Sequence, residues 1–358
     1  MPLVAHSNLP AFARLAEEGE EILSPDRASH QDVRELHIGL LNMMPDAAIQ
    51  ATERQYMRLI SSSNRIVQFH IHPFTFPEIP RTDAAQEHID KFYESPQSLQ
   101  EEGLDALIIS GATPIEPDIR DEIFWKPLVE MLDWANSNVT SVLCACLATH
   151  AVVRYFHGLE RKPLKEKCWG VFPHRVSEAH HPLVRNTNTK FDVPHSRWNE
   201  IAADELVNAG LHLLVNSAES GVHMATSPDG LSFVYFQGHP EYDKVSLLKE
   251  YKREVNRFLY GDREEFPPPP AHYFSPEARE ITDQIEARFT KKRHPNMLTE
   301  FPESELLARV DNTWLDTGKS VFNNWLGLVY KYTHMDRRIP YMDGVDPQDP
   351  LQLRRPGI

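Results

Sequence analysis

The first half of the chain alternates short apolar runs with longer stretches in which apolar residues recur every three or four positions. Short runs of this kind are typical of buried strands, and the longer stretches are typical of helices packed on one face. The runs cover residues 36–42, 67–72, 106–110 and 141–146, and the main helical stretches cover 47–60 and 124–134. Alternating strands and helices predict an α/β fold with a parallel sheet covered on both faces.

The second half of the chain is more irregular, because prolines and glycines interrupt it often. It predicts short strands at 171–174 and 191–194, a hairpin from 211–217 and 222–226, a buried strand at 231–237, and helices at 246–258, 276–290 and 321–332. We expect an N-terminal arm (1–35), one large domain (36–336) and an irregular tail (337–358). Within the domain, we expect the proline run 267–270 to cross the surface and the helical part after it to pack back on the domain.

Composition excludes several classes of function. The formal net charge is −15, which argues against binding to nucleic acid or to an anionic membrane surface. Three cysteines are too few for a disulfide framework and favour a reducing compartment. No apolar stretch approaches the length of a membrane span, and the first residues do not resemble a signal peptide. We therefore expect a cytoplasmic protein.

Cys146 lies where a predicted buried strand passes directly into a helix, in the segment SVLCACLATHAVV. Such a turn presents the side chain at the carboxyl edge of the sheet, beside helix N–H groups that favour a thiolate. A buried structural cysteine is the alternative interpretation of this residue, and it is the one that we favour for Cys144.

A second predicted strand ends in the segment FVYFQGHPEYD, which delivers His239 and Glu241 to the same sheet edge. The imidazole suits a general base and the carboxylate suits a group that orients it, so these residues and Cys146 form a candidate nucleophile–base–orienter set. A histidine that merely caps a turn is the alternative. The sequence has no HExxH motif or paired CxxC motif, so we expect no catalytic metal.

Several segments together resemble the homoserine O-succinyltransferase family of acyltransferases, including LNMMP, SGATPIEP, KEKCWGVFPHR, DVPHSRWNEI and GHPEYD. The resemblance implies a class I glutamine-amidotransferase-like, flavodoxin-like fold and a cytoplasmic homodimer. It implies that Cys146 accepts the acyl group, that His239 is the base and that Glu241 is its partner. It also implies three substrate-binding residues, Lys167, Ser196 and Arg253, with acyl-CoA and L-homoserine as substrates and no cofactor.

Some positions depart from the family pattern. Leu147 replaces a tryptophan, His150 replaces a glutamine, and the loop that usually begins GAP reads GATPIE. In the family, the residue at one position of this loop correlates with the acyl group that the enzyme transfers. In this chain that position corresponds to Ile115 or, after a shift of one residue in the alignment, to Glu116. We predict an oxyanion donor at the Leu147 N–H, with a second from this loop.

The reaction that we predict is succinyl transfer through a cysteine acyl-enzyme, with succinyl-CoA as the donor. Three alternatives stay open from the sequence. In the first alternative, the acyl donor is acetyl-CoA. In the second, the protein is a glutamine-amidotransferase-like hydrolase that uses the same three residues. In the third, it is a catalytically silent binding protein with the same fold.

Overall fold

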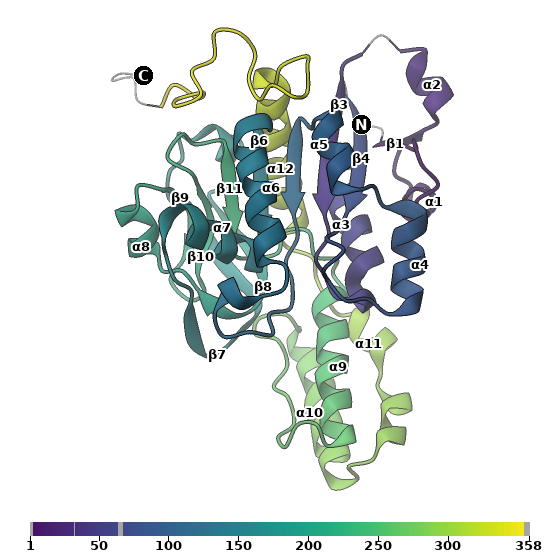
Figure 1. Cartoon of the computed structure of the whole chain (residues 1–358). Helices are drawn as coiled ribbons and strands as arrows, with labels where there is room; N and C mark the ends of the chain where they lie inside the picture. The colour runs from purple at the N-terminus through teal and green to yellow at the C-terminus, as the bar shows by residue number, and fades with distance from the viewer. Residues whose placement is uncertain (1–2, 32, 64–66, 354–358) are drawn as a thin grey trace.

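The computed structural model describes residues 3–31, 33–63 and 67–353. Its eleven strands form one sheet in the order β2-β1-β4-β3-β5-β6-β11-β10-β9-β7-β8 (Figure 1). The centre of the sheet holds β3 (Glu35–Leu41), β4 (Gln68–Phe74), β5 (Ala106–Ile109), β6 (Ser141–Ala145) and β11 (Phe233–Phe236). These are the five buried strands that the apolar runs predict.

The central strands pair in parallel throughout. Taken in chain order, they lie side by side as 2-1-3-4-5, which is the flavodoxin-like arrangement. The predicted α/β fold with a mostly parallel sheet is therefore confirmed. In such sheets, ligands bind at the carboxyl ends of the strands.

The other end of the sheet is antiparallel. The predicted hairpin is confirmed as β9 (His212–Ser217) and β10 (Gly221–Thr226). The two short strands expected near 171–174 and 191–194 are the inner parts of a long ribbon, β7 (Lys162–Val176) and β8 (Lys190–Glu200). The outer part of β7 is mostly polar and exposed, so it lacks the apolar pattern that would have predicted it.

Helices cover both faces of the sheet, and each face has its own core. One core includes Tyr56, Phe322 and Trp325, and it lies under α1 (Pro10–Glu17), α3 (Ile49–Ser61) and α12 (Leu315–Tyr332). The opposite core lies under α5 (Pro96–Glu102), α6 (Trp125–Asn138) and α7 (Leu147–His157). The remaining α-helices of the body are α2 (Pro25–Ser29), α4 (Asp83–Phe92) and α8 (Ala203–Asn208).

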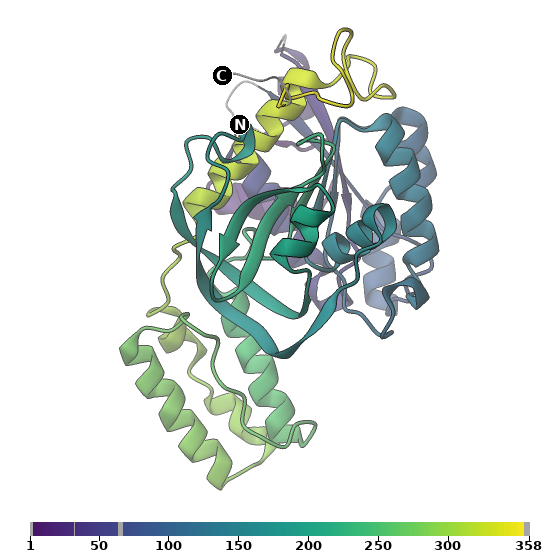
Figure 2. The same cartoon turned by 90° about the vertical axis from the view of Figure 1, so that its left-hand side faces the viewer.

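A helical projection extends from the carboxyl edge of the sheet (Figures 1 and 2). It contains α9 (Ser246–Tyr260), α10 (Pro276–Lys291) and α11 (Glu303–Leu307), packed around a third core. The run of four prolines leads from α9 to Ala271, which pairs with β7 through hydrogen bonds to Trp169 and Val171. Gly170 has φ 151°, and a Cβ there would lie 2.2 Å from the Ala271 carbonyl oxygen, so this contact requires glycine.

The N-terminal segment, expected as an arm, is packed into the body. Its strands β1 (Leu3–Val4) and β2 (Ile22–Leu23) extend the sheet beyond β4, and Leu9, Phe12 and Leu15 are buried in the first core. Two-residue strands are too short to give a periodic signal, which is why the sequence pattern misses them. Residues 337–353 contain no helix or strand, in keeping with the irregular tail expected there.

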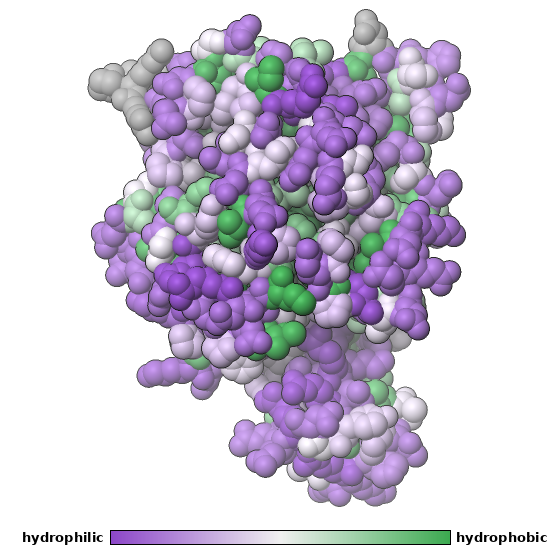
Figure 3. All heavy atoms as spheres, viewed as in Figure 1, coloured by the Kyte–Doolittle hydropathy of each residue, from purple (hydrophilic) through white to green (hydrophobic). Residues whose placement is uncertain are grey.

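The surface in Figure 3 is mostly hydrophilic, and its apolar side chains form small separate groups. Within the described ranges, none of the helices combines the length and the apolar character that crossing a bilayer requires.

Candidate active site

Cys146 occupies a strained turn between β6 and α7. Its backbone has φ 51° and ψ −110°, a combination that non-glycine residues rarely adopt. The Cys146 N–H donates to the Phe236 carbonyl oxygen of the neighbouring strand β11 at 2.7 Å, which holds the turn in place. The residue is the N-cap of α7 and is partly exposed. The strand-to-helix placement expected for this cysteine is thus present.

His239 and Glu241 lie on the loop that follows β11. Because β11 is the immediate parallel neighbour of β6, the two loops leave the sheet side by side. The His239 Nδ1–H donates to Glu241 Oε1 at 2.7 Å, which leaves Nε2 as the nitrogen available to a reacting group. Nε2 is buried and has no hydrogen-bond partner among the described nitrogen and oxygen atoms.

The electrostatic environment of His239 favours its protonated form. Burial of the ring lowers its pKa, but the charges of Glu241 and Cys146 and hydrogen bonding to both groups raise it by more, so the pKa lies well above the usual value. Cys146 and Glu241 are thus the two groups that act on the imidazole and favour its charged form. The structure brings together the three residues of the predicted set.

Close packing fixes the loop around His239. The His239 N–H donates to the Pro194 carbonyl oxygen at 2.8 Å. A Cβ on Gly238 would lie 2.6 Å from Val193 and 2.8 Å from His195, so a glycine is needed for this approach to β8. Beyond the loop, Asp243 forms ion pairs with Arg54 and Arg58 of α3.

A second cluster of polar side chains gathers on Glu250 of α9. Glu250 Oε2 accepts from the Ser196 hydroxyl at 2.7 Å and pairs with Lys167 Nζ at 3.3 Å. Glu250 Oε1 accepts from the Tyr242 hydroxyl at 3.0 Å. Burial raises the pKa of Glu250, but Lys167, the Ser196 bond, Arg253 and His239 lower it below the usual value. A buried carboxylate is therefore held ionised beside the candidate triad.

Of the predicted substrate-binding residues, Lys167 and Ser196 contact the Glu250 carboxylate. Arg253 acts on it only through its charge and pairs with Glu254. Arg253 lies one turn after Glu250 on α9, and its side chain is mostly exposed. Sequence reasoning missed Glu250 and Tyr242. Two signals in the sequence could have pointed to them. Glu250 lies one helical turn before Arg253, and Tyr242 comes directly after Glu241, but neither feature is specific for a binding site without the fold.

The predicted oxyanion donors differ in their environment. Leu147 is the first residue of α7, so its N–H has no acceptor within the helix and lies directly after the nucleophile. In the other loop, the Ile115 and Glu116 N–H groups both donate to Glu122 Oε1, at 2.7 and 2.9 Å. The Ile115 side chain is 81% exposed. The roles of Leu147, Ile115 and Glu116 stay predictions.

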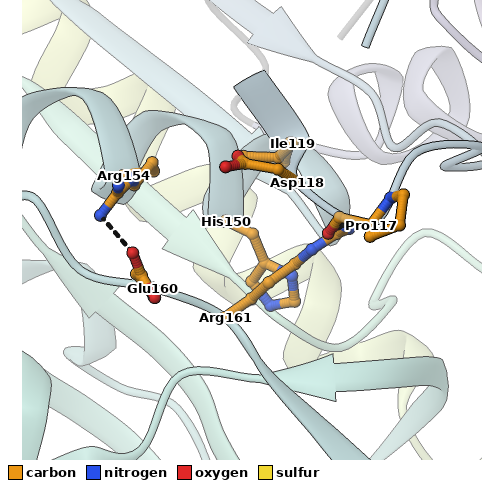
Figure 4. Close-up of a pocket in the computed structure, with 7 residues that line it drawn as sticks. All are labelled: Pro117, Asp118, Ile119, His150, Arg154, Glu160 and Arg161. Carbon is orange, nitrogen blue, oxygen red and sulfur yellow. Dashed lines mark hydrogen bonds and ion pairs between the residues drawn. The ribbon is translucent and has the colours of Figure 1, made fainter. Parts of the chain in front are cut away.

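His150 faces away from the candidate triad. Its ring is buried, which lowers its pKa to about 4, and Nε2 donates to Gln237 Oε1 at 3.0 Å. It lines a pocket of about 220 Å³ (Figure 4), whose other lining residues are Pro117, Asp118, Ile119, Arg154, Glu160 and Arg161. None of these residues belongs to the Cys146–His239–Glu241 set.

Comparison with known proteins identifies the family. The model of the family described as HTS, homoserine O-succinyltransferase, matches residues 2–335. The chain belongs to the homoserine O-succinyltransferase family. Among its relatives are proteins named homoserine O-succinyltransferase from Methylobacter tundripaludum, 57% identical, and Methylococcus capsulatus, 56% identical. Each alignment covers 99% of this chain and the whole relative. The resemblance inferred from the sequence is confirmed.

Solved structures of low identity also resemble the chain. A glutamine amidotransferase from Methylobacillus flagellatus is 12% identical, with a TM-score of 0.45 over 83% of this chain and 95% of its own. Another from Thermotoga maritima is 12% identical, with a TM-score of 0.41 over 84% of this chain and 99% of its own. The homoserine O-succinyltransferase family is thus identified by sequence, whereas the fold class follows from the strand order described above.

Proposed function

We propose that the protein transfers the succinyl group of succinyl-CoA to the hydroxyl of L-homoserine, the reaction for which its relatives are named. The observation that carries this proposal is the strained Cys146 turn beside the His239–Glu241 pair, in a chain that the family matches almost throughout. The product, O-succinyl-homoserine, would belong to methionine biosynthesis, and we propose a cytoplasmic homodimer as its working form.

In the first half-reaction, the Cys146 thiolate attacks the thioester carbonyl of succinyl-CoA. The C–S bond to CoA breaks, a new thioester forms on Cys146, and the imidazolium of His239 protonates the departing CoA thiolate. Glu241 keeps the Nδ1 proton in place and stabilises the imidazolium, the role of the third group in such triads. The N–H of Leu147 is suited to stabilise the oxyanion.

In the second half-reaction, neutral His239 removes the proton of the homoserine hydroxyl at Nε2. The resulting alkoxide attacks the Cys146 thioester, the ester product forms, and Cys146 leaves as a thiolate paired with the protonated imidazole. This sequence is a ping-pong reaction, because CoA departs before the acceptor reacts. Nε2 serves both steps, which agrees with its lack of a partner among the described nitrogen and oxygen atoms.

The Glu250 cluster is suited to hold the amino-acid end of the acceptor. A buried ionised carboxylate provides an acceptor for the homoserine ammonium, while Arg253 and Lys167 provide cations for its carboxylate. Tyr242 contacts both Glu250 and His239, so an amino acid bound at Glu250 would lie beside the base. This position would direct its hydroxyl toward Cys146.

A CoA-release assay that crosses succinyl-CoA and acetyl-CoA with homoserine and serine tests the proposal. We expect the highest kcat/KM for the pair succinyl-CoA and homoserine. A higher value with acetyl-CoA would favour the acetyl alternative. Ammonia release from glutamine without any acyl-CoA would favour the hydrolase alternative, which the family assignment makes less attractive than acyl transfer.

A further inference from the structure

Four histidines lie together near the amino ends of strands β3 and β4, at the opposite end of these strands from the Cys146 loop. His37 of β3 is directly opposite His70 of β4 in the parallel register, and their rings stack with centroids 4.6 Å apart. His72, two residues after His70 and on the same face of β4, also stacks on His37. His6, which follows β1, packs against both His70 and His72.

Hydrogen bonds orient the two inner rings of this group. His72 Nδ1 lies 2.7 Å from Glu94 Oε1, and His72 Nε2 lies 2.9 Å from His37 Nδ1. The carboxylate can only accept, so the His72 Nδ1 atom carries the proton of that bond. When the other ring nitrogen of His72 accepts, the His37 Nδ1–H is the donor to it.

This proton order leaves a lone pair on His37 Nε2. His37 Nε2 faces Glu35 Oε2 at 3.5 Å, and His70 Nε2 faces the same oxygen at 3.8 Å. His70 Nε2 is buried without a hydrogen-bond partner among the described residues. Three electron-rich atoms therefore converge on one point.

We propose that Glu35 Oε2, His37 Nε2 and His70 Nε2 bind a divalent transition-metal ion, with Zn²⁺ as the best match. Two imidazoles and one carboxylate are a donor set that Zn²⁺ accepts, with water as the fourth ligand. Tetrahedral Zn²⁺ places its ligand atoms roughly 3.3 Å apart. The two separations from Glu35 Oε2, 3.5 and 3.8 Å, are a few tenths longer, and all three ligand atoms lie within 4.8 Å of one another. The half-exposed Glu35 side chain is free to adjust.

The hydrogen bonds behind His37 match the surroundings of a metal-bound histidine. A ligating histidine usually donates its other N–H to an outer partner, which fixes the ring and raises its basicity. Here that partner is His72, and Glu94 in turn holds His72. An ion at this point would link strands β3 and β4 near their amino ends. It would leave the His37–His72 and His72–Glu94 hydrogen bonds in place.

A second group, His6, His72 and Glu94, also has its potential ligand atoms within 4.8 Å of one another. An ion there would need the His72 Nδ1 atom without its proton, so it would break the 2.7 Å bond to Glu94. The Glu35 group is therefore favoured. Arg337 lines the same hollow as Glu35 and His37, and its charge opposes a bound cation.

Zinc titration of the full-length chain tests this proposal. The protein should carry Cys146→Ser, so that the active-site thiol does not take the metal, and should first be dialysed against a chelator. Calorimetry is expected to show one Zn²⁺ per chain, and Co²⁺ is expected to give the intense visible spectrum of a four-coordinate ion. Thermal unfolding should shift upward with Zn²⁺ concentration, because the ion binds the folded chain.

Matched variants locate the site. Glu35→Gln, a conservative change at a half-exposed position, and His70→Ala should each weaken Zn²⁺ binding by at least about 100-fold, and His72→Ala by about 10- to 100-fold. Arg337→Gln should strengthen binding, and His180→Ala, at an exposed position, should leave it unchanged. Absence of saturable binding would overturn the proposal. Binding that survives Glu35→Gln but is lost in His6→Ala would overturn it too, because the ion would then occupy the second group.

Discussion

The ring of Tyr242 stacks on the imidazole of His239, with the centroids 4.3 Å apart and the planes inclined by 18°. The hydroxyl of the same tyrosine donates to Glu250, the carboxylate that also contacts Lys167 and Ser196. One side chain thus connects the candidate base with the cluster that we propose for the amino-acid acceptor. In the proposed complex, this aromatic ring would position the acceptor and the base relative to each other.

Tyr242→Phe should raise the KM for homoserine by about 10- to 100-fold, because it removes a hydrogen bond to a charged group and keeps the stacked ring. The first half-reaction should be nearly unchanged, since it does not use the acceptor. Steady-state kinetics with homoserine varied, together with the rate of CoA release in a single turnover, separate the two effects. An equal loss in both half-reactions would mean that Tyr242 acts only by supporting His239.

Cys146→Ser should lower acyl transfer by at least about 10³-fold and leave the fold intact. Mass spectrometry after exposure of the unmodified protein to succinyl-CoA alone should find a succinyl adduct on Cys146. Cys168→Ser, at a partly buried position outside the triad, is the matched control and should keep both the adduct and the activity. An adduct confined to Cys144 or Cys168 would refute the assignment of the nucleophile.

His239→Ala should cost at least about 10²-fold in turnover, which is the usual contribution of general acid–base catalysis. His150→Ala should cost less than this by at least about tenfold, because the His150 ring lines a different pocket and bonds Gln237. The two losses are compared by measuring the turnover of each variant at equal concentrations of folded protein. The reverse order of the two losses would make His150 the base.

Glu241→Gln should reduce the stability of the folded chain most in mildly acidic solution. The pKa of His239 is raised in the folded state, so the stabilisation from its protonated form is complete below the unfolded value near 6.5 and fades as the pH rises through the raised value. Without the Glu241 charge, that stabilisation shrinks. The free energy of unfolding, measured by denaturant at about pH 6 and about pH 9, should therefore differ more between wild type and variant at the lower pH.

Glu116→Gly should change the ratio of kcat/KM for succinyl-CoA and acetyl-CoA by less than about threefold. The expected residue at the acyl-selective position is Ile115, and the carboxylate of Glu116 then plays no part in choosing the acyl group. Glu122→Gln is a useful companion, because Glu122 holds the N–H groups of both loop residues. A strong swing toward succinyl-CoA in Glu116→Gly would show that Glu116 is the selective residue.

The sequence predicts the parallel core well because its strands are short, apolar and clearly bounded. The runs that end near Asn42, Gly111 and Gly238 all correspond to strands, and the cysteine and histidine at two strand ends lie together because β6 and β11 are neighbours. Their direct adjacency is not visible in the sequence, since more than ninety residues separate Cys146 from His239. The strand-end positions of both residues already place them at one sheet edge, and the resemblance to a family agrees with that pairing.

Other features depend on contacts that leave little local signal. Strands β1 and β2 have two residues each and exist because β4 offers a free edge. Glu250 is a charged residue in an amphipathic helix, and only the ribbon of β7 and β8 reveals that it is buried against Lys167 and Ser196. The histidine group on β3 and β4 contains no local metal motif, because its ligands come from two strands more than thirty residues apart.

The helical projection has a core of its own, and α9 within it carries Glu250 and Arg253, whereas Cys146 and His239 follow strands of the sheet. A side chain placed at Gly170, where Ala271 meets β7, would loosen that core. Cys146 and His239 would keep their positions, whereas Glu250 and Arg253, which we propose to bind the acceptor, would not. Under the proposed mechanism, such a protein would still accept the succinyl group on Cys146 and would then lose it to water. Whether each succinyl-CoA that is used yields an acylated amino acid would therefore depend on the stability of the helical projection.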